Sequence, residues 1–153
     1  MSTLKYFVNV PGTPIPRAVK FSRFGSYNTK RVRNWMDLIR DMAKVEVVSK
    51  RLSASEGTPV NIFITAHMPL PKATAKKRIP DLIGSPHIKT PDTDNLIKPI
   101  KDALTEAKVW ADDNQVWKVH ATKIYCRPGQ GRAEISIFWE TRDRDPSNSL
   151  KRQ

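Results

Sequence analysis

We predict four strands in this chain, three of them from the alternation of apolar and polar side chains. Residues 4–10 alternate clearly, with Tyr6, Val8 and Val10 on one side, and residues 59–67 repeat the pattern. Residues 116–127 and 132–140 are predicted as the last two strands. The Pro-Gly-Gln-Gly sequence between them predicts a hairpin turn.

A period of 3.6 residues predicts a long helix over residues 29–51, capped by Asn28 or Thr29. Its apolar face is expected in the core or in a dimer interface. That face comprises Val32, Trp35, Met36, Ile39, Met42 and Ala43. Its basic residues are interpreted as a solvated face.

A second helix is predicted from about Asp94, which is also a plausible N-cap. Pro99 lacks the amide that would bond the carbonyl of Asn95, so we expect either a later helix start or a small kink. The apolar face comprises Leu96, Ile97, Ile100, Ala103, Leu104 and Ala107. Asp94, Lys98, Lys101, Asp102 and Thr105 fall on the other side.

Two segments lack this periodicity. Residues 17–27 form a predicted basic and aromatic loop, and residues 68–90 form a long charged segment with a short helix expected at 73–78. The pattern as a whole predicts one α+β domain over residues 1–140, with a mixed sheet and two main helices. Residues 141–153 are polar and are predicted to be a flexible tail.

Composition excludes several classes of protein. The chain has 153 residues and a net charge of +12, which favours a polyanionic partner such as nucleic acid. One cysteine allows neither an intrachain disulfide nor a cysteine zinc site, which fits a reducing, cytoplasmic setting. No apolar run approaches the roughly 20 residues of a membrane helix, so no membrane association is expected. No glycine-rich phosphate loop is present, so no nucleotide cofactor is expected.

Basic side chains in the two irregular segments are the candidate DNA contacts. They are Arg17, Lys20, Arg23, Lys72, Lys76, Lys77, Arg78 and Lys89. In the first segment Phe21, Phe24 and Tyr27 accompany them, a mixture that suits phosphate contact with base stacking. An ordinary loop whose aromatic side chains anchor it to the core explains the same residues equally well.

Acidic residues gather in one stretch of this basic chain. Five of the ten aspartates fall between Asp92 and Asp113. Clustered carboxylates repel one another, and a bound cation relieves that repulsion. We therefore infer a metal site. Taken singly, each aspartate is better explained by a helix cap or a turn, and Lys98 is also explained by an ion pair with Asp94 or Asp102. Only the set together, with Lys98 at its offset, favours the metal site.

These motifs resemble a known family. The sequence Asp92-Thr93-Asp94-Asn95-Leu96-Ile97-Lys98, then Asp102-Ala103-Leu104, then Asp112-Asp113-Asn114-Gln115-Val116 is similar to the pattern of RusA-type Holliday-junction resolvases. The resemblance covers most of the chain. It implies a RusA-like fold and a homodimeric, Mg²⁺-dependent DNA endonuclease of a bacterial cell, phage or prophage, with Mn²⁺ as a substitute ion.

The resemblance also implies the roles of individual residues. Asp92, Asp94 and Asp113 match the metal-binding acids of the family, and Lys98 matches its active-site lysine. Asp112 is adjacent and is a further candidate ligand. The expected reaction is the resolution of four-way junctions by paired symmetric nicks, in DNA recombination and repair. The alternatives are a non-catalytic nucleic-acid-binding module and a nuclease for forks or flaps.

Overall fold

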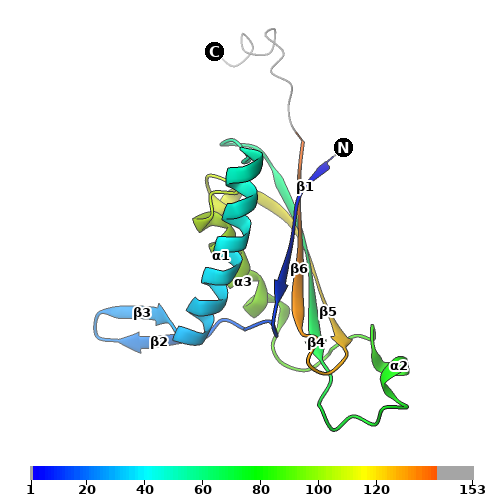
Figure 1. Cartoon of the computed structure of the whole chain (residues 1–153). Coiled ribbons are helices and arrows are strands. Elements are labelled where there is room, and N and C mark those ends of the chain that lie inside the picture. Colours follow the sequence, from blue (N-terminus) through cyan, green and yellow to red (C-terminus); the bar gives the residue numbers. More distant parts are fainter. Residues whose placement is uncertain (1, 141–153) are drawn as a thin grey trace, which may run out of the picture.

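The structure is a computed structural model that describes residues 2–140, so the predicted tail at 141–153 lies outside the described residues. Two long helices cover one face of a mixed sheet (Figure 1). In chain order the elements are β1 (Thr3–Pro11), β2 (Val19–Ser22), β3 (Gly25–Asn28), α1 (Lys30–Lys50), β4 (Val60–Pro69), α2 (Ile79–Leu82), α3 (Thr93–Glu106), the 3₁₀ turn η1 (Asp113–Gln115), β5 (Val116–Cys126) and β6 (Arg132–Trp139).

Within residues 2–140 the main sheet has four strands in the order β1-β6-β4-β5. The β4–β5 pair is parallel, whereas β6 runs antiparallel to both β1 and β4. A parallel pair needs a long crossover, and here α3 lies in the chain between β4 and β5. The predicted α+β class with a mixed sheet and two main helices is confirmed.

The core lies between the sheet and the helices α1 and α3. Inward side chains alternate along the strands, as Ile62 and Ile64 do on β4 and Ile135 and Ile137 do on β6. Each such side chain, once buried, stabilises the fold by about 1.5–3 kcal/mol. Helical residues close the other side of the core. They are Trp35, Met36 and Ile39 of α1 with Leu96, Ile100 and Leu104 of α3.

Helix α1 begins after Thr29, one of the two caps expected. It ends at Arg51, whose φ of 48° is the left-handed conformation that stops many helices. Its apolar face is buried as predicted, and Met42 is partly buried. Among residues 2–140, no helix combines the length and the apolar character needed to cross a bilayer.

The basic and aromatic segment at 17–27 is not a loop, so that prediction is wrong. Strands β2 and β3 pair antiparallel and form a hairpin that extends away from the body beside the start of α1 (Figure 1). Gly25 has a φ of 119°, a conformation that suits glycine at the tight turn. Each strand has only four residues with no buried side chain, so apolar alternation is weak.

The predicted hairpin between the last two strands is also wrong. Residues 128–131 do turn the chain back, but β6 pairs with β1 and β4 and makes no pair with β5. The turn therefore passes over the end of β4, which lies between the two strands. A short turn fixes the relative direction of two strands, and it does not determine whether a third strand lies between them.

The segment at 68–90 is more ordered than its sequence indicates. The short helix occurs at Ile79–Leu82 and not at residues 73–78, which form turns. Pro80 lies in its first turn, where the missing amide costs nothing. The chain then follows the free edge of β5, and bonds such as His87 N–H to Lys123 O at 3.0 Å fix it there.

Candidate active site

The first acidic motif lies at the start of α3. Asp92 is the N-cap residue and Asp94 lies in the first turn, so the N-cap prediction for Asp94 is wrong by two residues. Both side chains are exposed, and within residues 2–140 neither carboxylate has a hydrogen-bond or ion-pair partner. The positive end of the helix dipole favours negative charge here. The two carboxylates are thus available to a ligand.

Lys98 lies on the same helix as Asp94 and close to the second acidic motif. It lies one turn after Asp94 on α3, and its ammonium donates to Asp102 Oδ1 at 2.8 Å. The same Nζ lies 3.9 Å from Oδ2 of Asp113. The Asp112-Asp113 turn, although distant in sequence, therefore lies beside the exposed face of α3. Lys98 itself is half exposed, so its charge is accessible.

A capping box fixes the turn that carries Asp113. Asp112 Oδ1 accepts from Asn114 N–H, and Gln115 Oε1 accepts from Asp112 N–H, each at 2.9 Å. The Gln115 amide also donates to the carbonyls of Ser55 and Thr58, at 2.9 and 3.1 Å. Asp112 thus has a structural role, and its service as a metal ligand stays a prediction.

Lys123 of β5 positions the chain just before Asp92. Its ammonium donates to the carbonyls of Lys89 and Pro91, at 2.7 and 2.6 Å. A charged donor with two carbonyl acceptors makes strong hydrogen bonds. The sheet therefore holds the entry to the acidic motif directly.

Pro99 resolves the question of the start of α3. The helix begins at Thr93 and runs through Pro99, so a later start is excluded. The carbonyl of Asn95, which Pro99 cannot bond, accepts from Arg17 N–H at 2.7 Å. The missing helical bond is thus replaced by a bond that joins the chain entering the hairpin to the candidate site.

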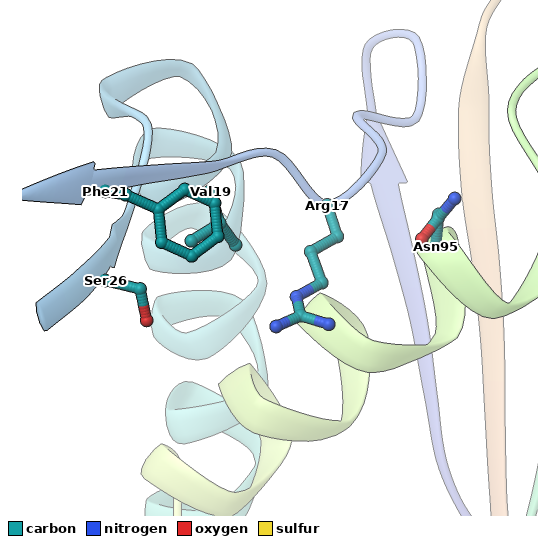
Figure 2. A pocket seen from close by; sticks show the side chains of 5 residues that line it. All are labelled: Arg17, Val19, Phe21, Ser26 and Asn95. Atoms are coloured by element: carbon teal, nitrogen blue, oxygen red, sulfur yellow. The ribbon is translucent and has the colours of Figure 1, made fainter.

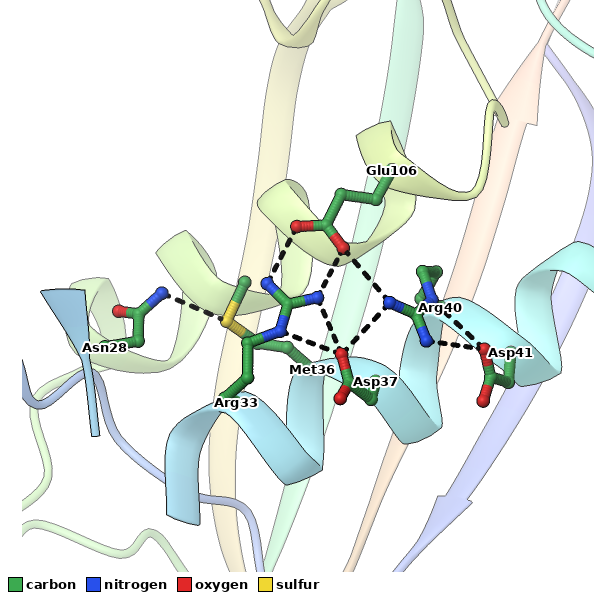
Figure 3. Close-up of polar contacts among 7 residues, drawn as sticks. All are labelled: Asn28, Arg33, Met36, Asp37, Arg40, Asp41 and Glu106. Carbon is green, nitrogen blue, oxygen red and sulfur yellow. Dashed lines mark hydrogen bonds and ion pairs between the residues drawn. The ribbon is translucent and has the colours of Figure 1, made fainter. Parts of the chain in front are cut away.

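An ion-pair network joins the far end of α3 to α1 (Figure 3). The Arg33 guanidinium donates to both oxygens of Glu106, at 2.9 and 2.6 Å, and its Nε donates to Asp37 at 2.8 Å. Arg40 bridges the same two acids. The Arg33 hydrogen bonds hold the pKa of Glu106 below its usual 4.5, and those to Glu106 and Asp37 raise the pKa of Arg33.

The predicted metal ligands match a divalent cation in chemistry but are not gathered around one point. Exposed aspartate oxygens are the donors that Mg²⁺ prefers. Within residues 2–140, however, no three His, Cys, Asp or Glu side chains lie close enough together to hold one ion. The ligand roles of Asp92, Asp94 and Asp113 remain predictions.

The predicted DNA-contacting residues are all exposed and fall on two segments. Arg17, Lys20 and Arg23 belong to the hairpin and its entry, whereas the others belong to the segment around α2. Figure 1 shows these segments at the same end of the molecule, on either side of the start of α3. The second group comprises Lys72, Lys76, Lys77, Arg78 and Lys89.

Comparison with known proteins identifies the family. The profile described as endodeoxyribonuclease RusA matches residues 10–138, nearly the whole chain. The chain belongs to the RusA endodeoxyribonuclease family. The resemblance of the aspartate motifs is thereby confirmed, and the chain is assigned to a family of DNA-cleaving hydrolases that includes Holliday-junction resolvases. A search among individual curated proteins gave no match.

Three residues support the candidate site through bonds that were not predicted, although Arg17 is among the candidate DNA contacts and Gln115 is in the second motif. Gln115 was detectable, because an aspartate followed three residues later by glutamine is a capping-box signature. Lys123 and Arg17 were not detectable as supports, because their bonds go to distant backbone carbonyls. Such contacts leave no local pattern in a sequence.

Proposed function

We propose that this protein is a Mg²⁺-dependent endonuclease that resolves four-way DNA junctions by paired symmetric nicks, in recombination and repair. Membership of the RusA family supports DNA cleavage. The observation that carries the assignment of the site is the position of Lys98, 2.8 Å from Asp102 and 3.9 Å from Asp113. That position supports a site in which the Asp112-Asp113 turn lies beside the exposed face of the helix whose first turn carries Asp94.

Asp92, Asp94 and Asp113 are the proposed ligands of Mg²⁺, with Mn²⁺ as a substitute. Bound divalent metal supplies a water of lowered pKa and neutralises negative charge on the phosphate. The aspartates contribute oxygen donors at a helix start that is open to solvent.

Lys98 is proposed to stabilise charge that develops on the phosphoryl oxygens or to orient the attacking water. Its ammonium is a compact cation on a flexible stem, and half of its surface is exposed. The contacts with Asp102 and Asp113 fix the direction of that stem. A donor held in place before the reaction loses little free energy to reorganisation.

Junction binding is assigned to the basic residues on both sides of the start of α3. Their charges attract phosphate without reading sequence. A four-way junction has near two-fold symmetry, and two matched cuts require two equivalent sites. A C2 homodimer supplies them.

Cleavage of matched substrates tests the proposal. A four-way junction, a replication fork, a flap and a linear duplex of the same sequence are mixed with the protein in Mg²⁺ or in EDTA. We expect the junction to be cut first in Mg²⁺ and nothing to be cut in EDTA. Preferential cleavage of the fork or flap would replace the junction assignment with another branched substrate, and binding without cleavage in any divalent ion would overturn the catalytic proposal.

A further inference from the structure

An open pocket of about 300 Å³ lies between the β2–β3 hairpin and the start of α3 (Figure 2). Its volume is at the lower end of the range for small-molecule sites. Asn95 contributes from α3, immediately after Asp94. The pocket therefore adjoins the proposed site of cleavage. Its lining comprises Arg17, Val19, Phe21, Ser26 and Asn95.

The register of the hairpin separates its two faces. Phe21 lies opposite Ser26 in the strand pairing, and both line the pocket. Lys20 lies opposite Tyr27, and neither lines the pocket. Because successive residues of a strand point to opposite faces, Tyr27 lies on the side away from the pocket.

The pocket has an aromatic wall and free polar groups. Phe21 is 85% exposed, so the face of its ring is accessible to a ligand. Within the described part of the chain, the side chains of Arg17, Ser26 and Asn95 have no hydrogen-bond partner. Figure 2 shows the Arg17 guanidinium between the hairpin and Asn95. The lining thus offers a flat apolar surface together with donors and acceptors.

The chain fixes this pocket to the candidate active site. Arg17 N–H donates to the carbonyl that Pro99 leaves free on α3, at 2.7 Å. Where the chain leaves the hairpin, Thr29 N–H donates to Ala18 O at 3.0 Å and closes its base. The Asn28 side-chain amide contacts the sulfur of Met36 on α1. The base of the hairpin is therefore anchored on both helices.

We propose that this pocket binds one nucleobase that is unstacked from the DNA beside the cleaved phosphate. Phe21 stacks on the face of the base, and Arg17, Ser26 and Asn95 contact its edge. Arginine and asparagine are suited to base edges, because their paired polar atoms match guanine and adenine. The pocket would then determine the sequence at which the junction is cut. The inference rests on the proposed function, since it places the pocket beside the nick.

Replacement of single nucleotides by an abasic analogue tests the pocket. Full-length protein is given four-way junctions that carry one abasic position near the crossover, and the rate of cleavage in Mg²⁺ is measured for each. We expect one position at which the loss of the base slows the wild-type protein by between about 5-fold and 100-fold. Phe21→Ala should slow the intact junction similarly and be insensitive to the abasic change at that position.

Tyr27→Ala is the matched control, because it removes an exposed aromatic ring from the opposite face of the same hairpin. It should keep the wild-type sensitivity to the abasic position. Thermal melting and junction binding in EDTA check that both variants fold. The pocket assignment is overturned if no position matters, if Phe21→Ala keeps the sensitivity, or if Tyr27→Ala loses it equally. A wild-type protein that cuts no junction would instead overturn the proposed function, and this inference with it.

Discussion

At the scale of single residues, Lys98 is the most informative side chain of the candidate site. Its ammonium contacts Asp102 and lies near Asp113, and its other surface is open to solvent. An ion pair with Asp102 alone would make it structural. Its approach to Asp113, at 3.9 Å, is the observation that supports its proposed role in the site.

Lys98→Met should slow cleavage by about 100-fold or more while junction binding changes little, because one preorganised charge is lost from the site. Single-turnover cleavage in Mg²⁺ and binding in EDTA measure the two effects. Lys101→Met, three residues along the same helix, is the matched control and should cleave normally. If Lys98→Met cleaves at the wild-type rate, Lys98 serves only as an ion-pair partner.

The candidate site rests on residue types and spacing along the chain, whereas the bonds that support it are visible only in the structure. Asp92, Asp94, Lys98 and Asp113 were identified from their motif, because the order of side chains along the chain carries that information. The bond between the Asn95 carbonyl and Arg17 N–H was not predicted. It depends on the approach of the segment that carries Arg17, which is remote in sequence.

At the scale of elements, the contact between α1 and α3 fixes the helix that carries the acids. The Arg33–Glu106 pair is bidentate, and the pKa of Glu106 is lowered chiefly by its hydrogen bonds to Arg33. A lowered pKa means that the stabilisation is present above the ordinary value of 4.5 and is lost as the pH falls through the lowered value.

Glu106→Gln should lower the melting temperature at pH 7 by about 2–4 °C, a modest effect because solvent screens these half-exposed charges. The difference from the wild-type protein should begin to shrink as the pH falls below 4.5 and should vanish once the pH is below the lowered pKa of Glu106, where the folded wild-type side chain is neutral too. Thermal melting at a series of pH values measures both effects. Glu46→Gln, which removes an ion pair within α1, is the control. A difference that does not change with pH would contradict the electrostatic account.

Pro99→Ala should loosen the attachment of the hairpin. The new amide competes with Arg17 N–H for the carbonyl of Asn95, so hydrogen exchange at the Arg17 amide should become faster. Amide exchange followed by NMR measures this directly, with Pro80→Ala in α2 as the control. Unchanged exchange at Arg17 would show that the bond does not depend on the proline.

Long periodic elements were predictable from the sequence, whereas pairing between strands was not. The helices α1 and α3 and the strands β1, β4 and β6 follow their apolar patterns, because a buried face requires that pattern. The hairpin β2–β3 buries no side chain and therefore carries little signal. The insertion of β4 between β5 and β6 depends on contacts across the whole sheet.

At the scale of the whole molecule, the proposed reaction requires two copies of the chain. Sedimentation equilibrium at micromolar concentration should give twice the chain mass of 17.4 kDa. The reason is the substrate, whose two-fold symmetry calls for two equivalent sites. A mass of one chain for the free protein, together with a single chain bound to each junction, would contradict the proposal of paired cuts by a homodimer.

The most direct test of the central claim uses one synthetic four-way junction, labelled on each strand in turn. It is incubated with the wild-type protein or with Asp94→Asn, in Mg²⁺ or in EDTA. We predict that the wild-type protein makes paired, symmetric, ligatable nicks in Mg²⁺ and none in EDTA. Asp94→Asn should bind the junction but cleave it more slowly by about 100-fold or more. Equal cleavage by Asp94→Asn, or cleavage in EDTA, would contradict the assignment of the acidic motif at the start of α3 as the metal-dependent active site.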